Sequence, residues 1–158
     1  MKYFIVIFLL VSFLCGEETD VDIKANNFTA DKSKNSIIFT GKVSMLKAED
    51  KLFCDKLTVY TKTDAKTNKT VIQNYIAVGH VNMSVKRPTT VMIGKGDKIT
   101  YDVDEQIYVI TGDGYLEDVA GQKIIKGEKI YFDQKNENTN IDGGKNKPLQ
   151  FKLKIESK

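Results

Sequence analysis

The sequence has 158 residues, of which 41% are hydrophobic and 28% are charged, and its net charge is +3 at pH 7. This length and composition suit one folded, soluble domain, and the small net charge, with lysines interspersed among acidic residues, argues against a nucleic-acid-binding protein. Val and Ile are common and Pro is rare, which favours strands over helices.

The N-terminus has the features of a secretory signal. Lys2 precedes an uncharged, mostly apolar run from Tyr3 to Leu14. This run is shorter than the about 20 residues that a membrane span needs, and it fits the apolar region of a signal peptide. We therefore predict a signal peptide at residues 1–16, cleaved to leave a single domain at residues 17–158. Lipidation at Cys15 and an uncleaved anchor remain alternatives, although the bulky residues before Cys15 make a poor lipidation motif.

A seven-residue pattern recurs four times along the chain. Each copy opens on a small residue, continues with polar residues and ends in alternating apolar positions. The copies span residues 25–31, 54–60, 96–102 and 127–133. A polar patch and an apolar stretch follow each copy and run into a glycine: Gly41, Gly79, Gly112 and Gly143. The spacing from opening residue to glycine is 16 in three copies (25 to 41, 96 to 112, 127 to 143) and 25 in the other (54 to 79).

Each repeat is predicted to be a strand, a polar turn and a second strand. Apolar residues alternate with a period of two, as at Ile99 and Tyr101. Three copies end in Asp, whose side chain can accept a hydrogen bond from the backbone two residues on. The glycine in the second strand indicates a bulge, a corner or a close backbone approach. The repeats therefore predict stacked antiparallel hairpins that bury one face against their neighbours.

The apolar face continues from one hairpin to the next. Ile37 and Phe39 have the same parity as Val43 and Met45, so all four are expected on one side. The last stretch alternates as well, with Leu149, Phe151, Leu153 and Ile155 on one face. A stack of such strands, folded along its length, encloses one continuous apolar seam.

These repeats resemble the OstA-like, or LptA-type, lipopolysaccharide-transport proteins. The resemblance is carried by "A-x-x-F-x-x-D … I-x-F-x-G-x-V" at residues 25–43, "C-D-K-L-x-V-Y" at residues 54–60 and "G-D-K-I-x-Y-D … Y-x-I-x-G-x-G" at residues 96–114. It covers about residues 23–155. It implies an all-β fold: an open-ended, V-shaped β-jellyroll (β-taco) of stacked antiparallel hairpin repeats.

The resemblance also implies a function. Proteins of this family are non-enzymatic periplasmic carriers that shield the acyl chains of lipopolysaccharide and pass them from an inner-membrane complex toward an outer-membrane translocon. They join head to tail into a bridge and need no cofactor. We expect the lipid-binding residues to lie in the apolar seam, and we assign to it Phe28, Phe39, Val43, Met45, Leu57, Val59, Val81, Met83, Ile99, Tyr101, Leu116, Ile130 and Phe132.

No catalytic or metal site is predicted from the polar residues. His80 is the only histidine, and its parity points it outward. Cys54 occupies the small-residue position that opens each repeat, so it is expected to pack rather than react. Asp55, Asp97 and Glu128 recur at one repeat position, which indicates a structural role rather than acid–base chemistry.

Two alternatives to a carrier remain open at the level of the sequence. One is a membrane-anchored, LptC-like assembly factor of the same pathway, which would retain residues 1–16. The other is a structural β-solenoid that acts as a binding module, with a closed core and aromatic residues on the outside. The inward parity of most aromatic residues argues against the second alternative.

Overall fold

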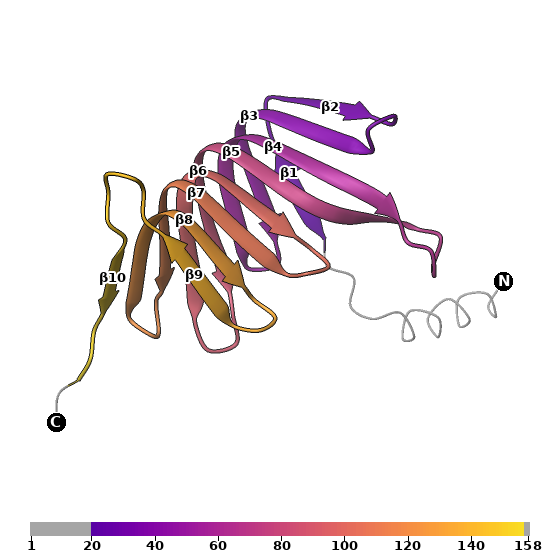
Figure 1. Cartoon of the computed structure of the whole chain (residues 1–158). Helices are drawn as coiled ribbons and strands as arrows, with labels where there is room; N and C mark the ends of the chain where they lie inside the picture. Colours follow the sequence, from indigo (N-terminus) through magenta and orange to yellow (C-terminus); the bar gives the residue numbers. More distant parts are fainter. Residues whose placement is uncertain (1–19, 157–158) are drawn as a thin grey trace.

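The computed structural model describes residues 20–156, so the signal peptide predicted at residues 1–16 lies outside the described residues. Within them the chain forms one ten-stranded antiparallel sheet (Figure 1), which confirms the all-β class. The strands are β1 Val21–Lys24, β2 Asn27–Asp31, β3 Ser36–Lys47, β4 Asp50–Thr63, β5 Thr70–Lys86, β6 Val91–Asp102, β7 Ile107–Asp118, β8 Lys123–Asp133, β9 Asn138–Asp142 and β10 Gln150–Leu153. No helix in this part of the chain is long and apolar enough to cross a membrane.

The long strands follow one another across the sheet in chain order from β3 to β8. At one end, β1 and β2 pair with the two halves of β3, and at the other end β9 and β10 pair in the same way with the two halves of β8. In the described part of the chain these end strands do not pair with each other, so the sheet remains open. The predicted open-ended stack of antiparallel hairpins is therefore confirmed.

A line of β-bulges, which we call the crease, divides the sheet into two leaves. The pairing register shifts at this line in every pair of long strands, for example between Thr40 and Val43 in β3. Figure 1 shows the long strands turning there. Leaf 1 contains residues 27–40, 56–78, 98–111 and 129–142. Leaf 2 contains residues 21–24, 43–54, 81–96, 114–127 and 150–153.

The bulges form where a glycine and the residue after it both have positive φ. The pairs are Gly41–Lys42 (83° and 47°), Gly79–His80 (84° and 48°) and Gly112–Asp113 (77° and 49°). Each pair opposes a single residue of a neighbouring strand, as Gly41 and Lys42 oppose Asp55, and such an extra residue bends a strand. The prediction of a bulge is confirmed at these three glycines. Gly143 follows the end of β9, has no positive φ and forms no bulge; there the predicted close backbone approach is found instead, because an added Cβ would lie 2.8 Å from Leu149 N and 2.9 Å from the Lys147 carbonyl oxygen.

The four sequence repeats form the hairpins of leaf 1: β2–β3, β4–β5, β6–β7 and β8–β9. The segments between repeats form the hairpins of leaf 2. The Asp that ends a repeat stabilises the turn as predicted, because Asp31 Oδ1 accepts the backbone N–H of Ser33 at 2.9 Å and Asp133 Oδ1 accepts that of Lys135 at 3.0 Å. The equivalent Asp102 accepts from a residue three positions on, Glu105, at 2.9 Å.

On alternate strands, the inward-facing residues switch between odd-numbered and even-numbered positions at the crease. In β3 the bulge has two residues, so Phe39 and Val43 both face inward with the same parity. In β4 only Asp55 stands opposite that bulge, so the inward residues are Cys54 on one side and Leu57 on the other. Because of this switch, the apolar residues of both leaves meet in one core.

Candidate functional site

Rows of inward-facing side chains cross the sheet, because paired residues of neighbouring strands stand on the same face, and two rows on each leaf lie nearest the crease. On leaf 1, the row beside the crease contains Phe28, Phe39, Leu57, Ala77, Ile99, Ile110, Ile130 and Ile141, and the next row contains Ala30, Ile37, Val59, Tyr75, Tyr101, Tyr108, Phe132 and Thr139. On leaf 2, the row beside the crease contains Val43, Cys54, Val81, Gly96, Gly114 and Gly127, and the next row contains Ile23, Met45, Leu52, Met83, Gly94, Leu116, Ile125 and Phe151. The space between these rows is the apolar seam.

Every residue predicted for the apolar seam lies on one of these rows, but the residues differ in what they face. Leu57 and Ile130 are fully buried beside the crease. Phe28 lies on the edge strand β2, where it is 68% exposed and stacks on Phe39 with 6.2 Å between ring centroids. Six others line cavities: Met45, Met83, Ile99, Tyr101, Leu116 and Phe132. Lipid contact by any of these residues remains a prediction.

The first cavity has a volume of about 280 Å³ and lies in the half of the seam formed by β3 to β7. Its walls are the apolar and aromatic side chains Met45, Leu52, Tyr75, Ala77, Met83, Val85, Ile99, Tyr101 and Tyr108. Its rim carries four cations, Lys47, Lys51, Lys86 and Arg87, and one carboxylate, Asp50. With four cations and one carboxylate, the rim is predominantly basic, and Asp50 Oδ1 accepts the backbone N–H of Lys86 at 2.8 Å.

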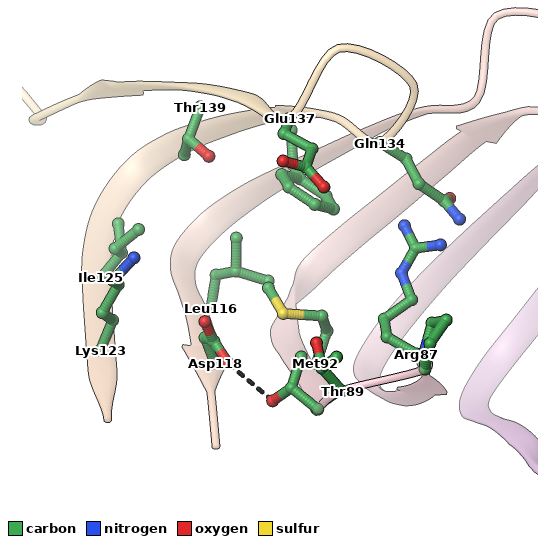
Figure 2. Close-up of a pocket in the computed structure, with 13 residues that line it drawn as sticks. Arg87, Thr89, Met92, Leu116, Asp118, Lys123, Ile125, Gln134, Glu137 and Thr139 are labelled. Atoms are coloured by element: carbon green, nitrogen blue, oxygen red, sulfur yellow. Dashed lines mark hydrogen bonds between the residues drawn. The ribbon is translucent and has the colours of Figure 1, made fainter. Parts of the chain in front are cut away.

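The second cavity has a volume of about 560 Å³ and lies toward β8 (Figure 2). Met92 and Leu116 form its floor on leaf 2, together with Ile125, and Phe132 contributes from leaf 1. In Figure 2, Gln134, Glu137 and Thr139 from the β8–β9 hairpin lie across the opening from the tips of leaf 2. The cavity is therefore bounded by both leaves, with apolar walls and a polar mouth.

A stack of aromatic rings links the two cavities along leaf 1. Tyr75, Tyr101, Tyr108 and Phe132 follow one another across the strands, with centroid separations of 6.4, 4.2 and 6.4 Å. Burial raises the pKa of the Tyr108 hydroxyl far above its ordinary value, and it raises the pKa values of Tyr75 and Tyr101 in the same direction. The wall therefore stays uncharged at neutral pH, as contact with hydrocarbon requires.

Arg87 and Gln134 stand where the two cavities meet. Both residues line both cavities, and Arg87 also lines the narrow apolar constriction between them. In Figure 2 the Arg87 side chain, from the hairpin tip of leaf 2, points toward Gln134, which lies beyond the end of β8 on leaf 1. The Gln134 Oε1 atom is buried and has no hydrogen-bond partner among the described residues.

The polar residues considered in the sequence lie outside the seam or pack within its wall. The His80 side chain is 92% exposed, and its Nδ1 lies 2.8 Å from Asp55 Oδ2, an interaction that raises the His80 pKa. Cys54 is buried, and burial raises the pKa of its thiol to about 11. Among residues 20–156, no group of three or more His, Cys, Asp or Glu side chains is arranged to hold a metal ion.

Sequence reasoning missed several residues of the site. Tyr75 and Tyr108 share the parity of the predicted seam residues of their strands and could have been included on that ground. Ile125 could not, because the parity switches at the crease in β8 and Ile125 is out of phase with Ile130 and Phe132. Arg87 had a different signal: it is the only arginine of the sequence, and the other 23 basic residues are lysines. Gln134 had none, because nothing in its local sequence indicates that it lies opposite Arg87.

Comparisons with known proteins identify relatives of this architecture. Residues 22–138 match the family model described as LptA/(LptD N-terminal domain) LPS transport protein. Comparison with proteins of curated function gave no match.

A solved structure has a similar fold. It is LptH, described as the LptA homologous periplasmic component of the conserved lipopolysaccharide transport device from Pseudomonas aeruginosa. The TM-score is 0.73 with 16% sequence identity, and the alignment covers 86% of this chain and 96% of that chain. At this identity the likeness shows the fold.

Proposed function

Because this chain belongs to the LptA/LptD N-terminal family of lipopolysaccharide-transport proteins, we propose that it is a periplasmic carrier that shields lipopolysaccharide acyl chains in its apolar seam. Family membership confirms the resemblance seen in the sequence. In this role the protein is exported by its signal at residues 1–16. It then receives lipid from an inner-membrane complex and passes it toward an outer-membrane translocon.

The observation that carries this proposal is the pair of cavities between the two leaves, with volumes of about 280 and 560 Å³ and apolar walls. One buried methylene is worth about 0.8 kcal/mol, so removing a tail of about 12 carbons from water is worth about 10 kcal/mol. Several such tails cross an aqueous gap only if they are covered. Covering them makes or breaks no covalent bond, so the proposed carrier needs no catalytic group.

The ends of the sheet support head-to-tail association, which is part of the proposal. The inner rows continue to both edges, where Phe28 is 68% exposed on β2 and Phe151 is 53% exposed on β10. Edge strands can pair with strands of another molecule. Pairing of one edge with the opposite edge of a second copy would extend the rows and cover these side chains.

Site-specific photo-crosslinking tests whether lipid occupies the seam. A benzophenone amino acid at Phe132 lies on the inner face and lines the second cavity, whereas the same group at the adjacent Tyr131 lies on the outer face. We expect lipopolysaccharide to crosslink at position 132 and not at position 131. Tyr101 and Thr100 form a second matched pair, at the first cavity.

Direct binding provides an independent measurement. The purified exported protein is expected to retain lipopolysaccharide on co-purification and to release it when unlabelled lipid A is added. No association in this assay, or equal crosslinking at positions 131 and 132, would contradict the proposed carrier. Sedimentation at increasing protein concentration tests self-association, and Phe151→Asp is expected to weaken it.

A further inference from the structure

We propose that Arg87 binds the phosphate of the lipid headgroup and places it where the two cavities of the apolar seam meet, so that hydrocarbon tails extend into the cavities on either side. This inference rests on the proposed function and adds to it a residue that determines specificity. It makes the protein selective for phosphorylated lipids over neutral lipids with the same tails.

The first support is the position of Arg87. It lines the first cavity, the second cavity and the constriction between them. The hairpin that carries it is held on both sides: Lys86 N donates to Asp50 Oδ1 at 2.8 Å, and Arg87 N donates to the Thr90 carbonyl at 2.8 Å. Arg87 is therefore a cation on an anchored backbone at the mouth of the seam.

The second support is the choice of residue. The chain uses lysine for every other basic position and arginine only here. The guanidinium is planar and presents its N–H groups in a fork that matches two phosphate oxygens, whereas the lysine ammonium acts as a point charge. A single arginine at the junction of two cavities with apolar walls is a chemical match to phosphate.

The third support is what surrounds the guanidinium. None of the ion pairs formed within residues 20–156 involves Arg87. The carboxylates nearest the mouth have other partners: Asp50 accepts the N–H of Lys86, and Asp118 accepts the Thr90 hydroxyl at 2.6 Å and the Gly121 N–H at 3.0 Å. Glu137 is exposed on the rim of the second cavity. The guanidinium is thus available to an anion.

Gln134 completes the complementarity. Its buried Oε1 lacks a donor among the described residues, and Figure 2 shows its side chain and that of Arg87 directed toward each other across the mouth. A phosphorylated sugar carries phosphate oxygens that accept from Arg87 and hydroxyl groups that hydrogen-bond the side-chain amide of Gln134, which lines both cavities. The lipid A headgroup has both kinds of group, whereas a fatty acid has no sugar hydroxyl and a neutral glycolipid has no phosphate.

The test compares the affinity of the purified full protein for lipid A carrying its phosphates with its affinity for dephosphorylated lipid A, by displacement of fluorescent lipopolysaccharide. The wild type is expected to prefer the phosphorylated form by about tenfold, the range of a charge-assisted hydrogen bond. Arg87→Gln should abolish that preference without weakening binding of dephosphorylated lipid A, and Arg87→Lys should restore it in part. Lys95→Gln, on the outer face above the Tyr115 ring, is the charge-matched control and should leave it unchanged.

The outcomes separate this inference from the proposed function. If Arg87→Gln keeps the preference, or weakens both lipids equally, Arg87 does not bind the headgroup phosphate while the carrier function stands. If the wild type binds neither lipid, the proposed function fails and this inference fails with it. Displacement of lipid A by inorganic phosphate at the same concentration would show an ordinary anion site and would also overturn the assignment. Thermal unfolding of each variant verifies that the fold is retained.

Discussion

Replacement of Gly112 by alanine should destabilise the protein by distorting the crease. Gly112 has φ 77°, and a non-glycine residue in the left-handed region costs about 1–2 kcal/mol. A Cβ added there would also lie 2.6 Å from Asp97 Cβ and 2.7 Å from Asp97 Cγ, well inside contact distance. Because overpacking of this kind costs about 1–3 kcal/mol, we expect Gly112→Ala to lower the free energy of unfolding by about 2–5 kcal/mol.

Urea unfolding followed by circular dichroism measures this change. Gly144→Ala is the matched control, because Gly144 has no positive φ and an added Cβ would lie 3.6 Å from Glu128 Cβ, an ordinary contact. Its effect should remain within about 0.5 kcal/mol. Adding Asp97→Gly to Gly112→Ala should remove the steric part and leave about 1–2 kcal/mol of backbone strain.

Two results would refute this reasoning. One is an equal loss of stability for Gly112→Ala and Gly144→Ala, which would mean that the positive φ at the crease does not require a glycine. The other is simple additivity of Gly112→Ala and Asp97→Gly, which would mean that the two side chains do not compete for the same space. The slope of the unfolding free energy against urea must stay constant for the comparison to hold.

Three further predictions concern the core and two titratable groups. Ile130→Ala, at a fully buried position, should cost about 2–5 kcal/mol of unfolding free energy, and a cost no larger than that of Leu46→Ala on the outer face would be inconsistent with its burial. The pKa of His80 should lie above 6.5 in an NMR titration and return toward 6.5 in Asp55→Asn. The imidazole is charged below its raised pKa, and the ion pair with Asp55 is lost as the pH rises through that value; an unchanged titration in the variant would disprove the pairing. Cys54, with its pKa raised to about 11, should react with a thiol reagent at pH 8 only after unfolding in urea, and rapid reaction of the native protein would show that the thiol is accessible.

The repeats predicted much of the fold because each signal is local. Asp31 and Asp133 mark turns through hydrogen bonds to residues two positions on, and the equal spacing fixes the hairpins of leaf 1. The parity switch in β4 could not be predicted in this way. The sequence around Asp55 is that of an ordinary strand. Asp55 is the single residue opposite a bulge only because the two bulge residues, Gly41 and Lys42, lie on the neighbouring strand.

The site residues that were predicted follow the alternation of the strands, and those that lie in turns were missed. Parity placed Met83, Leu116 and Phe132 on the inner rows, because these positions obey the same alternation as their neighbours. Arg87 and Gln134 belong to turns of different leaves, far apart in the chain, so their meeting depends on how the sheet folds along the crease. Sequence patterns of single strands contain no such information.

The bend in the sheet recurs once in every second strand, so each successive hairpin pair brings its own copy of it. The angle between the two leaves is thus determined within each unit, while the length of the sheet depends on how many units follow one another. Gaining or losing one unit would alter the distance that the sheet spans and would leave the bend in each remaining strand unchanged.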